Sequence, residues 1–294
     1  MHYFFASKFM KLRWVYAGSR RILSLTMVAL TGLLPLTAGA ELLFAVSEGT
    51  SGGGAAVTDA QMAAKYKPLT EVMEKVLQDT VKVRYVRSFQ TLEDGMRSGQ
   101  FDLVLARPSD YPARGVRNYG YQAVTTTRPD GHCLLVVRKD APFKTLADVK
   151  GKRFMMPEES AYMTKFCQAE LRDQGVQPDL THYVREQAVI PFSLGNGLVA
   201  VGGVASYSGV AKRLDAEGLR VLHQSRPQPY LPLIAGRKVK PEQVQALRSA
   251  LSQLSQTPAG AQALGALGLK GFDVDPQPRL LALLDWLEGK PGAR

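Results

Sequence analysis

Cysteine is scarce in this sequence, with Cys133 and Cys167 the only two among 294 residues. There is no CxxC or CxxCH motif and no cluster of His and Cys residues, so nothing indicates a zinc or haem site, and we expect neither metal nor cofactor. The two cysteines are compatible with one disulfide in an oxidising compartment, and equally with two buried free thiols. The sequence leaves both possibilities open.

The chain also lacks a basic tract interleaved with aromatic residues, although Lys and Arg outnumber Asp and Glu by 37 to 26. Residues 1–40 hold five basic and no acidic side chains, so the formal net charge of +11 falls to +6 for the rest of the chain. This mild excess is compatible with small anionic ligands and argues against a nucleic-acid partner.

Residues 1–40 have the pattern of a secretory leader. Their basic start is followed by the apolar stretch Ile22–Pro35, which is too short to span a bilayer comfortably, and then by the small residues Ala38 and Ala40. We predict a secretory signal peptide that is cleaved after Ala40, which makes Glu41 the first residue of an exported protein without stable membrane insertion. An uncleaved membrane anchor is the alternative.

Catalytic motifs are missing as well. Three histidines follow residue 40, and none lies in a Ser/Asp or Cys/Asp motif. His132 and Cys133 are neighbours on a predicted strand, where adjacent side chains point to opposite faces. The neighbours Glu158 and Glu159 cannot flank a glycosidic bond as paired carboxylates do. We therefore predict a protein that is not an enzyme, with a secreted enzyme as the rival class.

What is present is an alternation of short apolar runs and helical patterns, which predicts an α/β protein. Strands are expected at 42–47, 81–86 and 101–106, separated by helices over 59–78 and 88–100. Pro68 lies inside the first helical pattern, so we expect a break or restart there. Such a βαβαβ run requires parallel strands with helices on the faces of the sheet.

The pattern restarts at Gly131. We expect strands near 132–140, 153–157, 180–185 and 219–225, a helix over 161–175, a glycine-rich helical stretch within 190–214, and amphipathic helices at the C-terminal end. No low-complexity linker separates the halves, so two lobes with crossing strands fit better than two domains in series. The predicted organisation is signal peptide 1–40, first lobe 41–127, second lobe 128–222, and a return to the first lobe with C-terminal helices over 223–294.

The order of these segments resembles a known family. "KYKPLTEVMEKVL" and "VKVRYVRSFQTLEDGMRSGQFDLVLARPSDYPARG" are similar to the first half of phosphate/phosphonate-type periplasmic substrate-binding proteins of ABC importers. "LLVVRKDAPFKTLADVKGKRFMMPEES" resembles the second half, and "GGVASYSGV" stands where the family has a second ligand-side loop. The resemblance covers about residues 42–269. It implies the type II periplasmic-binding-protein fold, in which each lobe is a mixed, mostly parallel sheet flanked by helices, with crossing strands between the lobes.

The resemblance further implies a function. A small anionic ligand, such as a phosphonate, phosphate or other oxyanion, would be captured between the lobes and delivered to the transporter's membrane permease. A periplasmic sensing module that reads the same ligand is the alternative within this fold.

The sequence departs from the family at two ligand loops. Where the family has a Ser-Thr-Ser-Gly-like turn at a helix start, this chain has "PEESAYMTK", which keeps Ser160 and adds Tyr162 but also brings two glutamates. The Gly-Pro of the first-lobe loop is Arg107–Pro108 here, while Tyr111 matches the family's tyrosine. The ligand therefore remains open among phosphonate, phosphate, sulfonate, carboxylate and an amino-acid-like zwitterion.

The glycine-rich loop "SEGTSGGG", residues 47–54, follows the first predicted strand. It matches neither GxxxxGK[ST] nor GxGxxG, so it is not a nucleotide loop. Ligands of open α/β sheets bind beyond the carboxyl ends of strands, which places this loop, and Arg107 at the end of another strand, at the predicted site. Residues Thr125–Arg128 are expected at the hinge. The predicted ligand-binding residues are Ser47, Glu48, Thr50, Ser51, Arg107, Tyr111, Ser160, Ala161, Tyr162, Ser206 and Tyr207.

Overall fold

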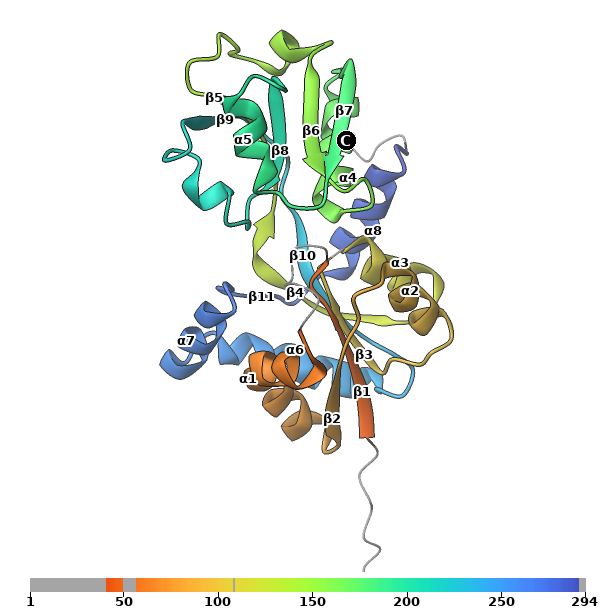
Figure 1. Ribbon diagram of the computed structural model, residues 1–294. Helices are drawn as coiled ribbons and strands as arrows, with labels where there is room; N and C mark the ends of the chain where they lie inside the picture. Colours follow the sequence, from red (N-terminus) through yellow and green to blue (C-terminus); the bar gives the residue numbers. More distant parts are fainter. Residues whose placement is uncertain (1–40, 50–56, 108, 291–294) are drawn as a thin grey trace, which may run out of the picture. The chain divides into compact units, whose positions relative to one another are not determined.

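The computed structural model describes residues 41–49, 57–107 and 109–290, which belong to one unit, Gly39–Arg294. They build two mixed sheets flanked by helices (Figure 1). The first sheet has the strand order β11-β4-β10-β3-β1-β2. Its strands are β1 (Glu41–Ser47), β2 (Thr80–Tyr85), β3 (Leu103–Ala106), β4 (Gln122–Gly131), β10 (Gln228–Ala235) and β11 (Gly271–Asp273).

Helices cover both faces of the first sheet. One apolar core joins the sheet to α1 (Asp59–Leu77), α6 (Pro241–Leu254) and α7 (Pro258–Ala266), through residues such as Met73, Leu247 and Leu264. On the other face, Leu92 and Met96 of α2 (Phe89–Arg97) pack on the sheet, beside α3 (Asp110–Asn118). The burial of both sheet faces explains why β1 and β3 are continuous apolar runs.

The second sheet has the strand order β7-β6-β8-β5-β9. Its strands are β5 (Cys133–Arg138), β6 (Arg153–Pro157), β7 (Leu180–Val184), β8 (Val201–Ala205) and β9 (Leu219–Gln224). Helix α4 (Tyr162–Asp173) packs on one face and α5 (Val189–Gly195) on the other, while η2 (Leu146–Val149) and η3 (Ala211–Arg213) are short 3-10 turns. Cys133 of β5 and Cys167 of α4 form a disulfide, which resolves the alternative left open by the sequence.

The chain passes between the sheets twice, from β4 to β5 and back from β9 to β10. Helix α8 (Gln277–Leu287) contacts both cores: Leu280 and Leu284 pack with Ala113 and Ala123 of the first sheet's side, and Trp286 packs in the core of the second. The predicted two mixed sheets with crossing strands are thus confirmed. Antiparallel pairs are about as common as parallel ones among the described strands, more than a mostly parallel arrangement allows.

The predicted break at Pro68 is wrong, because α1 runs unbroken from Asp59 to Leu77. Tyr66 and Leu69, on either side of the proline, are both buried in the same core. Packing of this face therefore outweighs the lost backbone hydrogen bond.

The glycine-rich helical stretch predicted within 190–214 is also wrong. Only α5 is helical there apart from the short turn η3, and "VGGVA" is strand β8, so Ser206 and Tyr207 follow a strand instead of starting a helix. A Cβ on Gly202 would lie 2.4 Å from Ile190 of α5, and one on Gly203 would lie 3.1 Å from the Cys167 sulfur. The glycines permit close packing on both faces of the strand.

Within the described ranges, no helix combines the length and the apolar character needed to cross a membrane.

Candidate functional site

The carboxyl ends of β1 and β3 lie side by side, because these strands are parallel neighbours. Ser47 ends β1 and accepts a backbone hydrogen bond from Arg107, which follows β3 (2.8 Å). Glu48 comes next, and the Arg107 Nε donates to its carbonyl oxygen (2.5 Å). The structure thus brings together three of the predicted residues at the edge where an open α/β sheet binds ligands.

Glu48 is a buried carboxylate that helix α1 neutralises. The Tyr66 hydroxyl donates to its Oε1 (2.5 Å), and the Lys65 ammonium pairs with the same oxygen. Burial, followed by the nearby Glu48 charge, raises the pKa of Tyr66 well above its ordinary value. The charge of the glutamate is therefore already compensated by neighbouring side chains.

Arg107 is enclosed by aromatic groups. Its Nη1 lies 3.3 Å from the Tyr230 hydroxyl, and its guanidinium carbon lies 5.4 Å from the Tyr207 ring centroid. The rings of Tyr207 and Tyr230 lie 4.6 Å apart. Burial disfavours the charge of Arg107, but the Tyr230 and Tyr207 hydroxyls and Glu48 outweigh it and raise the pKa of the guanidinium. Arg107 is thus a permanent cation, with its side chain only 15% exposed, at the meeting point of β3, β8 and β10.

Helix α4 begins next to this cluster. Ala161 is its N-cap and supplies no side-chain cap, so backbone N–H groups of the first turn are left for an incoming acceptor. The Tyr162 hydroxyl donates to the carbonyl of Pro229 in β10 (2.6 Å). Burial raises the pKa of Tyr162 and of Tyr207, which keeps both hydroxyls protonated.

An ion pair next to this cluster joins α3 to α4. The Lys165 ammonium lies 2.7 Å from Asp110 Oδ2, which also accepts from Arg114 (2.9 Å). Tyr111 covers this pair, with its ring centroid 5.2 Å from the Lys165 nitrogen and 4.2 Å from the guanidinium of Arg114. Tyr111 therefore packs on a cation cluster beside the site.

The side chains of Ser47 and Ser109 are fully buried on this edge. The Ser47 hydroxyl has no hydrogen-bond partner among the described residues, whereas the Ser109 hydroxyl lies beside the hydroxyl of Tyr162. A buried polar group without a partner carries a desolvation cost of about 1–3 kcal/mol. Their positions after β1 and β3, close to Arg107, mark where a ligand's acceptor oxygens would be received.

Not every predicted residue joins this cluster. Ser160 is exposed, and Ser206 accepts a hydrogen bond from the His132 backbone instead (3.0 Å). Thr50 and Ser51 lie outside the described residues. The expected hinge residues Thr125, Thr126 and Thr127 are fully buried in β4. That the predicted residues bind a ligand remains a prediction.

Sequence reasoning missed Lys65, Tyr66, Ser109, Lys165 and Tyr230. Lys65 and Tyr66 belong to the helical motif that carries the family resemblance, yet their inward orientation depends on where α1 packs. Tyr230 lies in "QPYLPL", whose two prolines concealed strand β10. No signal in the sequence alone would have brought Tyr230 to Arg107.

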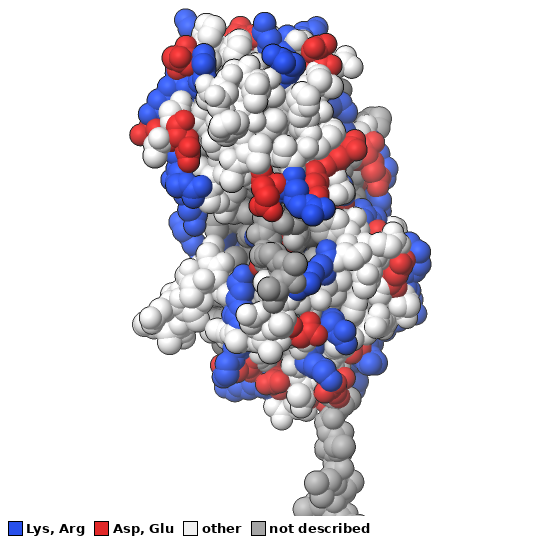
Figure 2. Space-filling view, viewed as in Figure 1, with Lys and Arg blue, Asp and Glu red and all other residues white. Residues whose placement is uncertain are grey.

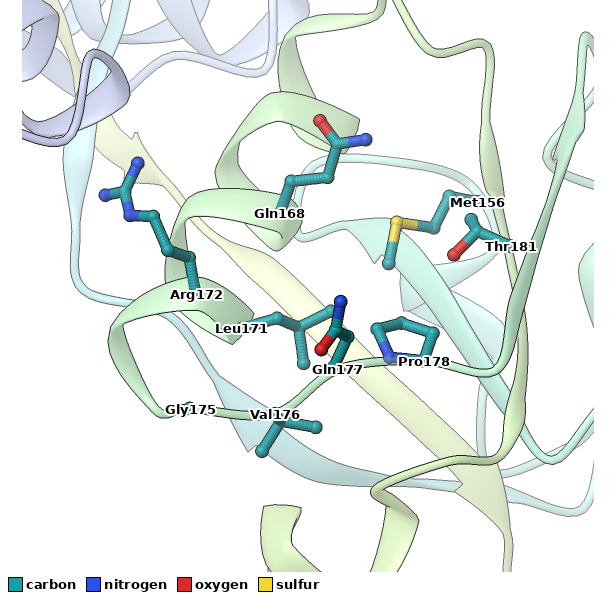
Figure 3. A pocket seen from close by; sticks show the side chains of 9 residues that line it. All are labelled: Met156, Gln168, Leu171, Arg172, Gly175, Val176, Gln177, Pro178 and Thr181. Atoms are coloured by element: carbon teal, nitrogen blue, oxygen red, sulfur yellow. The ribbon is translucent and has the colours of Figure 1, made fainter.

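A separate cavity of about 450 Å³ lies between α4 and β7 and is lined by Gln168, Leu171, Gln177 and Thr181, whose side chains are drawn in Figure 3. None of the predicted site residues lines it. Its one charged side chain, Arg172, is engaged by Asp173 and by carbonyls of α8. This cavity therefore lacks a largely buried cation and an unpaired buried hydroxyl of the kind found at Arg107 and Ser47.

Charge is dispersed on the face shown in Figure 2, where basic and acidic side chains alternate without a continuous basic patch. Within the described residues, no group of three or more His, Cys, Asp or Glu side chains could hold a metal ion. The site consists of the Arg107 cation, hydroxyl groups, aromatic rings and the N-terminus of α4.

Comparison with known proteins identifies the family of this chain. The sequence profile of the family described as "ABC transporter, phosphonate, periplasmic substrate-binding protein" matches residues 55–275. A comparison with curated protein sequences finds no match.

Solved structures share the fold. XAC2383 from Xanthomonas citri, bound to ATP, has a TM-score of 0.66 at 17% identity, covering 85% of this chain and 97% of that one. PhnD1 from Prochlorococcus marinus in complex with methylphosphonate has a TM-score of 0.63 at 13% identity, covering 85% and 97%. A binding protein component of an ABC phosphonate transporter from Pseudomonas aeruginosa has a TM-score of 0.57 at 17% identity, covering 85% and 86%.

Proposed function

This chain belongs to the family of phosphonate-type periplasmic substrate-binding proteins of ABC transporters, and we propose that its own ligand is a small oxyanion of the phosphonate or phosphate type. Members of this family are the component that captures a small molecule for the membrane transporter. The oxyanion would lie between the two sheets, held by Arg107, the hydroxyls of Ser47 and Ser109, and the first turn of α4.

The observation that carries the proposal is the fully buried, unpartnered hydroxyl of Ser47, with the buried hydroxyl of Ser109, close to the largely buried guanidinium of Arg107. The Arg107 Nε donates to the Glu48 carbonyl and its Nη1 to Tyr230, while its Nη2 lies 3.9 Å from Glu48 Oε2, beyond hydrogen-bond distance. N–H groups of Nη1 and Nη2 therefore remain for an anion. An oxyanion accepts from all these donors at once, which a neutral ligand cannot do as well.

Helix α4 adds a second source of attraction. Its uncapped N-terminus favours negative charge through free N–H groups and the helix dipole. Glu158 lies near this turn, where its charge would repel an anion. Its Oε1 pairs with the Nε of Arg185 at 3.3 Å. The ligands bound to the Prochlorococcus and Xanthomonas proteins, methylphosphonate and ATP, both carry phosphorus-bound oxyanions, in keeping with this chemistry.

The proposal extends to organisation and location. Cleavage after Ala40 would release a periplasmic protein whose first lobe comprises 41–127 together with 223–294, and whose second lobe comprises 128–222. The ligand would leave chemically unchanged, without catalysis, and neither nucleic acid nor stable membrane insertion would be involved. The transporter's membrane permease would receive the ligand-bound form.

A thermal-shift screen of residues 41–294 tests the ligand class. The panel is methylphosphonate, inorganic phosphate, methanesulfonate, acetate and glycine. At about one hundred times its dissociation constant, a true ligand adds roughly 2.7 kcal/mol to the free energy of unfolding. We expect this for a phosphorus oxyanion, with mass spectrometry recovering it intact.

Two variants locate the site. Arg107→Met should lower the affinity for that oxyanion at least tenfold, whereas Arg84→Met, at an exposed arginine of β2, should leave it unchanged. Stabilisation by acetate or glycine alone, or equal affinity in both variants, would contradict the proposal.

A further inference from the structure

Strand β10 is irregular at the point where it reaches the site. Its pairing with β4 shifts register between Gln228 and Tyr230 and again between Tyr230 and Leu233. A bulge of this kind turns a side chain away from the direction that a regular strand would give it. The side chain affected here is Tyr230, which meets Arg107.

The backbone of Leu231 is strained. Its φ of 45° is left-handed, a conformation that a leucine side chain rarely adopts. The following residue, Pro232, disfavours a helical conformation at Leu231 further. Gln78, the other non-glycine residue with positive φ among those described, ends helix α1, where left-handed backbone is usual. Leu231 has no such explanation, because it lies inside a strand.

Contacts from four separate elements converge on this segment. Pro229 accepts from Tyr162 at the start of α4 (2.6 Å), and the Tyr230 carbonyl accepts from Thr127 of β4 (2.9 Å). The Tyr230 side chain meets Arg107 after β3 and stacks on Tyr207 after β8. Three of these partners are predicted ligand residues. Strain of this kind persists where surrounding contacts determine the backbone, and it concentrates at functional sites.

We propose that the bulge Pro229–Leu231 is a positioning element for the ligand site, and that the left-handed backbone of Leu231 aims the Tyr230 hydroxyl at Arg107. This inference rests on the proposed oxyanion function. Tyr230 orients the guanidinium, and Leu231 acts through Tyr230 without touching the ligand. Ligand affinity should accordingly depend on the backbone that residue 231 permits, more than on the apolar side chain it carries.

Leu231→Gly and Leu231→Val separate these two dependences. Glycine adopts positive φ freely but removes the buried side chain, whereas valine keeps apolar bulk and resists positive φ. Isothermal titration of residues 41–294 with methylphosphonate and with inorganic phosphate should show Leu231→Gly within about twofold of wild type, although its unfolding temperature falls. Leu231→Val should bind at least tenfold more weakly. The opposite order of affinities, or equal affinities, would overturn the proposal.

Three further variants strengthen the test. Tyr230→Phe keeps the stacked ring and removes the hydroxyl, and it should weaken binding about tenfold, as expected for a hydrogen bond to a charged group. If Leu231→Val does not fold, Leu231→Asn and Leu231→Ala replace the pair, since Asn tolerates left-handed backbone and Ala does not. Asn should then bind better than Ala despite its polarity, and the reverse order would refute the role of the backbone.

Failure of the proposed oxyanion function can be distinguished from failure of the positioning role. If wild type binds neither probe, the oxyanion proposal fails, and crystal structures of the ligand-free variants then decide the positioning role. The Tyr230 hydroxyl should remain beside Arg107 in Leu231→Gly and move away in Leu231→Val. Unchanged geometry in both variants would overturn it.

Discussion

Asp110 and Lys165 form an ion pair that links α3 of the first sheet's side to α4 of the second, with 2.7 Å between Oδ2 and Nζ. The Asp110 side chain is only 2% exposed. Breaking a buried pair by removing one partner is costly, because the remaining charge stays out of water. Arg114 shares the carboxylate, which limits that cost.

Lys165→Met should therefore lower the free energy of unfolding by about 1–2 kcal/mol, measured by urea denaturation. A double-mutant cycle with Asp110→Asn should give a coupling energy of at least about 0.5 kcal/mol. Lys67→Met, which removes an exposed pair with Glu71, is the matched control and should change stability by less than about 0.5 kcal/mol. A coupling energy of zero would show that the pair does not hold the two helices together.

The disulfide between Cys133 and Cys167 spans 34 residues. Closing a loop of this length restricts the unfolded chain and should stabilise the protein by about 3–4 kcal/mol. Cys133→Ala combined with Cys167→Ala should lower the urea midpoint accordingly, and a reducing agent should destabilise wild type but not the double variant. Equal midpoints for wild type with and without reductant would contradict the expectation.

Glu288 gives the stability a dependence on pH. Hydrogen bonds from Arg117, and then from Lys290, hold the pKa of its carboxyl at about 2, compared with an ordinary value of 4.5. Because the folded-state pKa is the lower one, the contribution is complete above about pH 4.5 and is lost as the pH falls towards 2. The side chain is 39% exposed, so solvent screening keeps the contribution below about 1 kcal/mol.

Glu288→Gln should therefore show a shallower loss of unfolding free energy between pH 4.5 and 2 than wild type. Denaturant titrations at several pH values measure this slope. High salt should reduce the difference between the two proteins, since exposed ion pairs are screened. Identical slopes at low salt would exclude a role for the Arg117–Glu288 contact.

Two helical glycines should respond oppositely to the same substitution. A Cβ on Gly95 of α2 would lie 2.1 Å from the ring of the buried Phe101, whereas one on Gly265 of α7 would meet nothing within 4 Å. Gly95→Ala should destabilise the protein by about 1–3 kcal/mol through overpacking. Gly265→Ala should stabilise it by up to about 1 kcal/mol, because alanine favours the helix.

Thermal unfolding of both variants checks this pair. A stabilised Gly95→Ala protein would show that Phe101 can move aside. A destabilised Gly265→Ala protein would show that α7 has a neighbour at this position.

The sequence predicted the elements whose patterns are local. The strand at 42–47 and the helix over 161–175 correspond closely to β1 and α4, because apolar runs and helical spacing are visible without knowledge of neighbours. Tertiary packing decided the exceptions. Burial around Pro68 keeps α1 unbroken, and the faces of Gly202 and Gly203 are filled by Ile190 and Cys167.

The site was predictable only in part, for a related reason. Ser47, Glu48 and Arg107 follow strands whose ends meet, so a rule about parallel sheets finds them. Tyr230 lies in β10, where two prolines hide the strand pattern in the sequence. It points at Arg107 because of the bulge in this strand. Lys165 reaches Asp110 across a gap of 55 residues that no local pattern bridges.

The strand order also determines how long each sheet waits for its strands as the chain is supplied from its N-terminal end. All strands of the second sheet, β5 to β9, come from one continuous stretch, so this sheet has all its strands once residue 224 has emerged, although its core still waits for Trp286 of α8. The first sheet begins with the earliest residues but places β10 between β3 and β4, and β10 starts at Gln228. The edges of β3 and β4 that pair with β10 therefore stay unpaired while the strands of the second sheet come together. The sheet whose strands emerge first is thus the last to receive all of its strands, and its exposed strand edges need protection during that interval.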